Sequence, residues 1–227
     1  MEPAVENLND IIRAVDLAGV LGNAILGGIA ARSARLDLVG FGILAILSGL
    51  GGGIIRDTLL QGGVPVALTD PYYLILAIAG AAIAFVVPLQ GKWTQRPLAL
   101  IDALAVGCWS AVGVQKALDA GLGWLPAIIL GMITAVGGGM VRDVLLMRVP
   151  SIFGGNTLYA TSSLLASIVT VAFVVMGLPE VGALAAILTG GSLSLLAKRF
   201  GWVLPTEVRI PRPRWRESRR QRPGSER

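Results

Sequence analysis

Two copies of one motif place an arginine and an aspartate shortly after three consecutive glycines. The copies run from Gly51 to Leu60 and from Gly137 to Leu146, and both read G-G-G-apolar-apolar-R-D-x-L-L within long apolar segments. A glycine in a helix interior costs about 1 kcal/mol relative to alanine, and a charge inside an apolar span adds a further cost. Backbone carbonyls freed at such glycines can coordinate cations. A chain that carries both costs at two equivalent places is expected to use them in its function.

The composition is that of a polytopic membrane protein rather than a soluble one. Apolar residues make up 54% of the 227 residues and charged residues 15%. The chain has no histidine, and Cys108 is its only cysteine, which excludes an internal disulfide and Cys/His metal sites. We expect Cys108 to be a buried packing residue. No pattern of catalytic residues appears, so we expect neither enzymatic activity nor a bound metal or organic cofactor.

Seven apolar segments approach the length of about 20 residues that a helix needs to cross a bilayer. Glycine and proline turn signals separate them, and no connection is long enough to hold a soluble domain. We therefore predict an all-α polytopic membrane protein with seven transmembrane helices. The predicted spans are Ile11–Ala31, Leu38–Leu60, Tyr72–Leu89, Leu98–Leu118, Trp124–Met147, Thr157–Met176 and Val181–Ala197.

Lysine and arginine occupy alternate connections between the predicted spans, which indicates the orientation of the chain. We expect the N-terminus outside and the C-terminus in the cytoplasm, with the protein in the cell inner membrane. A transmembrane domain at 1–205 is expected to precede a disordered cytoplasmic tail at 206–227, whose eight arginines would favour anionic lipid more than nucleic acid. The cationic residues that set the orientation are Arg32, Arg35, Lys92, Arg96, Arg148, Lys198 and Arg199.

The first three predicted spans resemble the next three. A shift of 86 residues aligns Asp16 with Asp102, Gly27 with Gly113, and the whole first motif with the second. We therefore predict two repeats, at about 11–90 and 98–177, followed by a seventh helix at about 180–199. Because each repeat has an odd number of spans, the second repeat must be inverted in the membrane. This architecture is common in transporters, where the functional site lies between the repeats near the midplane.

The glycine triplets fall near the middle of the second and fifth predicted spans. One interpretation is that they kink or unwind these helices, because irregular backbone is tolerated at membrane depth when it lines an aqueous cavity. The alternative is close helix packing by small residues. The hydroxyls three residues before each triplet are also equivalent, and they could line the same path. The candidate pore and ion-pathway residues are Gly51, Gly52, Gly53, Gly137, Gly138, Gly139, Ser48, Thr134, Asp57 and Asp143.

The two motif arginines need partners inside the membrane. The aspartate next to each arginine is a poor candidate, since adjacent side chains diverge on a helix. Asp16 and Asp102 begin the first and fourth predicted spans near the expected depths of the arginines. We therefore predict two charge clasps, Asp16 with Arg56 and Asp102 with Arg142. The motif aspartates are then left to accept hydrogen bonds at helix ends or to face the pore.

Lys116 is a further charge that the first repeat lacks, because Ala30 occupies the equivalent position. Its long side chain could extend to the outer interface, as lysines near helix ends do. The alternative is an intramembrane gating charge that responds to the membrane potential.

The doubled motif in a three-plus-three-plus-one arrangement of spans resembles the prokaryotic branch of the trimeric intracellular cation (TRIC) channels. The resemblance covers about residues 11–200 and rests on the two G-G-G-x-x-R-D copies. It implies a homotrimer with one pore inside each protomer, lined by the second and fifth spans and permeable to monovalent cations, potassium above all. Some bacterial relatives are suspected of carrying small amino acids such as glycine.

The function expected from these features is a potassium-permeable channel of the cell membrane, with K⁺ or Na⁺ as the permeant ion. The alternative is a secondary transporter for a small zwitterion such as glycine, whose carboxylate would lie against broken helix ends. A structural membrane scaffold is a third interpretation.

Overall fold

The computed structural model describes residues 2–89, 91–153 and 158–203, and all regular secondary structure in these ranges is helical. The predicted tail at 206–227 lies outside the described residues, as does Thr157 at the start of the sixth predicted span. The elements of the described residues are α1 (Glu2–Ser33), α2 (Leu38–Leu60), α3 (Val66–Thr69), α4 (Pro71–Val86), α5 (Lys92–Asp119), α6 (Trp124–Leu145), the 3₁₀ helix η1 (Ser151–Phe153), α7 (Tyr159–Val175) and α8 (Pro179–Phe200).

Five of these helices are long and apolar enough to cross a membrane. They are α1 from residue 8 onward, α2, α5 from residue 96 onward, α6 and α8. The apolar helices α4 and α7 are shorter, with 16 and 17 residues. The prediction of an all-α polytopic membrane protein is confirmed at this level.

Short polar residues and left-handed backbone set the ends of several helices. The Asp37 side chain accepts a hydrogen bond from the Gly40 backbone N–H and begins α2. Asp70 accepts one from the Tyr72 N–H, and Pro71 follows it at the first position of α4. Both arrangements satisfy a backbone donor that a helix start leaves free. At the other end of α2, Gln61 adopts a left-handed conformation that stops the helix.

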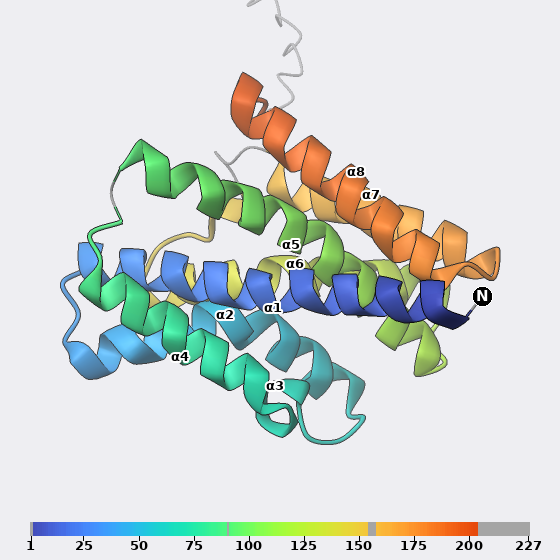
Figure 1. Cartoon of the computed structure of the whole chain (residues 1–227), viewed down its shortest axis with the longest axis horizontal. Coiled ribbons are helices and arrows are strands. Elements are labelled where there is room, and N and C mark those ends of the chain that lie inside the picture. The colour runs from blue at the N-terminus through green and yellow to red at the C-terminus, as the bar shows by residue number, and fades with distance from the viewer. Residues whose placement is uncertain (1, 90, 154–157, 204–227) are drawn as a thin grey trace, which may run out of the picture.

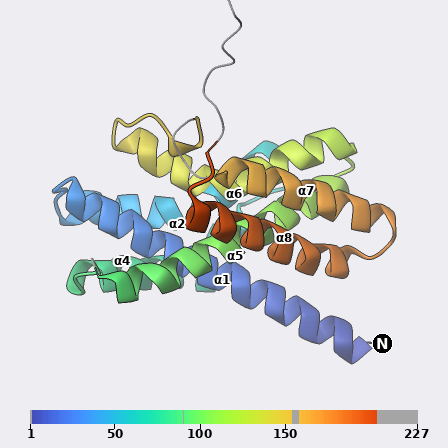
Figure 2. The same cartoon turned by 90° about the horizontal axis from the view of Figure 1, so that it is seen from above.

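The long helix α1 lies across the middle of the molecule (Figure 1). On one side it packs against α2 and α4, and on the other against α5. Helix α6 contacts α2, α5 and α7, while α8 covers α5 and α7 (Figure 2). The two motif-bearing helices, α2 and α6, therefore meet in the interior of the bundle.

Helices α1 and α5 cross with opposite chain directions. A Cβ added at Gly19 would lie 2.7 Å from the Cβ of Ala105, whereas one added at Gly22 would lie 2.8 Å from Ile101. The contact therefore moves backwards along α5 as it moves forwards along α1. These two helices hold Asp16 and Asp102, so their crossing brings the two equivalent carboxylates into one bundle.

Candidate functional site

The glycine triplets form the contact between α2 and α6. A Cβ added at Gly52 would lie 2.1 Å from the carbonyl oxygen of Thr134, and one added at Gly138 would lie 2.2 Å from that of Ser48. Only glycine fits at either position, because both obstacles are backbone. The two helices also cross in opposite directions. Both remain α-helical through their triplets, so these helices are not unwound there, and the kinked form stays a prediction.

The third glycine of each triplet has a different environment. Among the described residues, a Cβ added at Gly53 would meet one atom within 4 Å, the Arg56 Nη2 atom at 3.7 Å, and one added at Gly139 would meet the Arg142 Nη2 atom at 3.6 Å. Both distances are ordinary van der Waals contacts. In each triplet, the middle glycine therefore packs against the backbone of the other motif helix, whereas the third glycine faces an uncrowded space next to the motif arginine.

The two equivalent hydroxyls lie at this crossing but make different interactions. Thr134 donates a hydrogen bond to the Leu130 carbonyl within its own helix, at 2.7 Å. Ser48 is fully buried, and its Oγ atom has no hydrogen-bond partner among the described residues. Thr134 lines a cavity next to the crossing.

Two cavities lie next to the crossing and are built from equivalent residues. The first cavity has a volume of about 30 Å³, and the second has a volume of about 200 Å³. The residues that line the first are Asp16, Val20, Gly49, Leu50, Gly52, Gly53, Arg56, Val66, Ala67, Tyr73, Trp109 and Thr134. The residues that line the second are Asn23, Leu26, Asp102, Val136, Gly139, Arg142, Ser151, Ile152, Tyr159 and Lys198.

A third cavity of about 330 Å³ adjoins the first, and Val66 lines both. Asp57 and Lys116 lie in its wall, together with the glycine-containing turn that follows α2. This cavity therefore places the first motif aspartate next to a space larger than the first cavity itself.

Each motif arginine bonds to the aspartate that follows it. The Arg56 Nε atom lies 2.7 Å from an Asp57 carboxylate oxygen, with both side chains at least 90% buried. The equivalent distance from Arg142 to Asp143 is 3.4 Å. The predicted clasps to Asp16 and Asp102 are wrong as ion pairs. Arginine is long enough for its Nε to turn back toward the next residue, although the two Cβ atoms diverge.

The second oxygen of each motif aspartate accepts a backbone hydrogen bond. Asp57 accepts from the N–H of Val66, the first residue of α3, at 2.9 Å, and Asp143 accepts from that of Ser151, the first residue of η1, at 3.0 Å. Each aspartate thereby ties the end of its motif helix to the start of the next short helix. This is one of the two roles expected for these residues.

Asp16 and Asp102 bind aromatic and amide donors instead of arginine. Asp16 accepts hydrogen bonds from the Tyr73 hydroxyl and, at 2.7 Å, from the Trp109 indole N–H. Asp102 accepts from the Tyr159 hydroxyl at 2.9 Å and from the Asn23 amide at 3.5 Å. Our sequence reasoning missed these partners. The signal for the tyrosines was available, because the same 86-residue shift aligns Tyr73 with Tyr159.

Arg56 and Asp16 still line one cavity, as do Arg142 and Asp102. Each predicted pair therefore shares one cavity without forming an ion pair.

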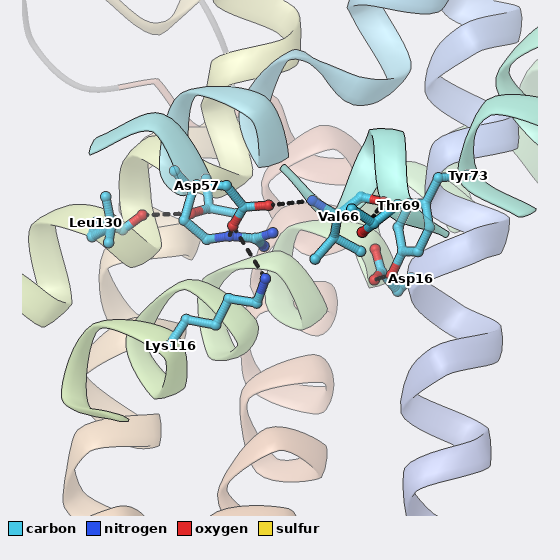
Figure 3. A network of polar contacts seen from close by, with 9 residues as sticks. Asp16, Asp57, Val66, Thr69, Tyr73, Lys116 and Leu130 are labelled. Atoms are coloured by element: carbon cyan, nitrogen blue, oxygen red, sulfur yellow. Dashed lines mark hydrogen bonds and ion pairs between the residues drawn. The ribbon is translucent and has the colours of Figure 1, made fainter. Parts of the chain in front are cut away.

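Two lysines complete the charged groups. The Lys116 amine lies 3.1 Å from Asp57, and the Lys198 amine lies 2.8 Å from Asp102. Figure 3 shows the Lys116 side chain extending from α5 to the Asp57 carboxylate, with Asp16 and Tyr73 nearby. The first charged group consists of Asp16, Asp57, Arg56 and Lys116, and the second of Asp102, Asp143, Arg142 and Lys198. Each group holds two carboxylates and two cations, so its formal charges sum to zero. Lys116 is an ion-pair partner rather than a chain extended to the interface, and Lys198 was not among the predicted site residues.

The described residues bring together no group of three or more His, Cys, Asp or Glu side chains that could hold a metal ion. Fold and site define a polytopic α-helical membrane protein whose interior carries two equivalent charged cavities next to a glycine-mediated helix crossing. The chain matches a family model described as Glycine transporter at residues 13–88 and 99–175. It is 32% identical to the UPF0126 inner membrane protein YadS of Escherichia coli K12, over 85% of this chain and 94% of the relative.

Solved structures agree with this result. A TRIC cation channel superposes with a TM-score of 0.79 at 31% identity, and the match covers 86% of this chain and 97% of the other. The orthologue of the trimeric intracellular cation channel from Rhodobacter sphaeroides gives a TM-score of 0.75 at 27% identity, over 85% and 99% of the two chains. The chain belongs to the prokaryotic TRIC family.

Proposed function

We propose that this protein is a monovalent cation channel, permeable to potassium, with a pore inside each protomer. The observation that carries the proposal is the pair of equivalent cavities, each with a carboxylate and an arginine, next to the crossing of α2 and α6. Carboxylate oxygens that line a confined path can coordinate a passing cation. The solved structures of TRIC cation channels with the same fold support this function.

The proposed path begins in the third cavity, passes the Asp57 carboxylate into the first cavity and continues past the glycine crossing into the second cavity. The third glycines Gly53 and Gly139 line this path, where a side chain is absent. The middle glycines let the two helices approach closely and so fix the narrowest part. No cofactor is required for this function.

We further propose that the chain forms an inverted repeat of three and three transmembrane helices with a seventh helix added. Helix α1 is antiparallel to its equivalent α5 where the two cross, and α2 is likewise antiparallel to its equivalent α6. Antiparallel equivalent helices are the relation expected of inverted repeats. In this proposal the apolar helices α4 and α7 also cross the membrane, despite their shorter length.

The orientation follows from the distribution of lysine and arginine described above. We propose that the N-terminus faces outside and the C-terminus the cytoplasm, in the inner membrane that the relative YadS also occupies. Asp57 and the third cavity would then face outward, and the second cavity would face the cytoplasm.

The assembly proposed is a homotrimer, supported by the trimeric channel from Rhodobacter sphaeroides with the same fold. Anionic lipid is the partner proposed for the arginine-rich tail.

The second candidate function is a secondary transporter for a small zwitterion such as glycine. It is favoured by the description of the matching family model. Each cavity also presents a cation and an anion, which suit a zwitterion's carboxylate and amine.

Purified protein in liposomes separates the two functions when potassium flux and uptake of labelled glycine are measured together. Conductance without saturable glycine uptake supports the channel, and saturable, gradient-coupled uptake without conductance refutes it. Gly53→Leu and Gly139→Leu should each fill a cavity and abolish the flux. Gly42→Leu is the matched control, because a Cβ added there would meet no other atom of the described residues within 4 Å.

A further inference from the structure

The first and second cavities have equivalent walls but very different volumes. Both contain an aspartate, an arginine, a tyrosine and a third motif glycine at positions 86 residues apart. The first cavity nevertheless has a volume of about 30 Å³, against about 200 Å³ for the second. The shared residues cannot explain this difference, so it must come from positions where the repeats diverge.

The two repeats differ most in one wall residue. Each repeat contributes this residue to the cavity that is otherwise lined by the other repeat's aspartate, arginine and tyrosine. Positions 23 and 109 are equivalent, since they lie 86 residues apart. Because α1 and α5 cross, each of these positions lies next to the aspartate of the other repeat. Trp109 of α5 therefore lines the first cavity and bonds to Asp16, whereas Asn23 of α1 lines the second and bonds to Asp102. One cavity receives an indole ring and the other a small carboxamide.

The indole is held firmly in its place. Its N–H bonds to Asp16 at 2.7 Å, only 7% of the residue is exposed, and its ring packs against α1, where a Cβ added at Gly19 would lie 3.0 Å from the ring. The other divergent pairs at equivalent wall positions are Leu50 with Val136 and Val66 with Ile152, and the members of each pair differ by one methylene group. The ring is therefore the largest difference between the two walls.

We infer that Trp109 is the residue that closes the first cavity and restricts ion passage through that half of the protomer. Asn23, at the equivalent position, leaves the second half open. The inference rests on the proposed channel function for its effect on ions. Its geometric part, the filling of the first cavity, can be tested without any ion flux.

The test replaces the tryptophan with the residue that the chain itself uses at the equivalent position. Trp109→Asn should raise single-channel potassium conductance several-fold in planar bilayers. Trp109→Phe is the matched control, because it loses the N–H bond to Asp16 but keeps an aromatic ring, and it should change conductance much less. An equal rise in both variants would overturn the inference, since the hydrogen bond rather than the ring would then be responsible.

Cysteine labelling provides a readout that does not depend on conduction. Ala67 lines the first cavity, so A67C in a background without the native cysteine reports access for a small cationic methanethiosulfonate reagent. W109N should raise the labelling rate several-fold over W109F. An unchanged rate overturns the inference. Raised labelling without conductance in any variant refutes the channel function but leaves the closure by Trp109 supported.

Two further variants cover a failure of W109N to assemble. W109L keeps an apolar side chain against α1 and should also raise the labelling of A67C, and an unchanged rate would overturn the inference. The reciprocal change Asn23→Trp should lower labelling of I152C in the second cavity. Unchanged labelling there would show that the exchanged position does not control cavity volume.

Discussion

Replacing Gly52 with alanine tests the crossing of α2 and α6. The added Cβ would lie 2.1 Å from the Thr134 carbonyl oxygen, and real Cβ atoms essentially never approach within 3.0 Å. The helices must therefore separate by about 0.9 Å at this point, as the difference of these two distances requires. The matched control is Gly53→Ala, one residue later, where the nearest atom is 3.7 Å away.

The expected difference in stability follows from these two environments. Alanine gains about 1 kcal/mol of helix propensity over glycine at both positions, so this contribution cancels. Overpacking typically costs about 1–3 kcal/mol, and a gap of this size loses roughly a quarter to a half of the dispersion energy between the facing atoms. Gly52→Ala should therefore be less stable than Gly53→Ala by about 1–3 kcal/mol.

Thermal unfolding of the purified protein in detergent measures this difference. For a chain of this length, 1 kcal/mol corresponds to roughly 2–4 °C in Tm. Gly52→Ala should melt several degrees below Gly53→Ala. Equal melting temperatures would refute the conclusion that the middle glycine is required by backbone contact.

Two further predictions concern the charged groups and the orientation. Asp102→Asn should destabilise the protein less in a Lys198→Met background than in the wild type, because no unpaired lysine remains. A double-mutant cycle should give a coupling of about 1–3 kcal/mol, and additive effects would show that the 2.8 Å ion pair contributes nothing. In a background without the native cysteine, cysteines at the exposed positions Gly62 and Leu178 should react with an impermeant reagent from outside intact cells, and one at Gly91 should not. The reverse pattern would invert the proposed orientation.

The helical fold could be predicted from the sequence because it depends on local signals. Apolar length identifies the spans, and the recurrence of the motif 86 residues later identifies equivalent positions. The buried position of Cys108 followed from its apolar surroundings and is confirmed.

The pairing of charges was not predictable from the same signals. Arg56 reaches Asp57 through a side-chain rotamer, and Lys198 reaches Asp102 from a helix 96 residues away that has no equivalent in the repeats. Both ion pairs depend on how the helices pack, which cannot be read from the spacing of residues in the sequence. Glycine disfavours helices, so the sequence alone left a helix break and close packing as alternatives, whereas the close contact between the two backbones is visible only in the structure.

The hydrogen bonds that join α1 to α5 also indicate how such a chain could have arisen. Trp109 donates a hydrogen bond to Asp16, and Asn23 donates one to Asp102. Each repeat therefore supplies an N–H donor for the aspartate of the other repeat. This reciprocal pattern is that of an isologous interface, the kind that joins two identical subunits. A three-helix ancestor that dimerised with itself would already satisfy both carboxylates. Gene fusion would then free the two copies to diverge, and the tryptophan in one copy opposite asparagine in the other is an asymmetry that no homodimer could hold.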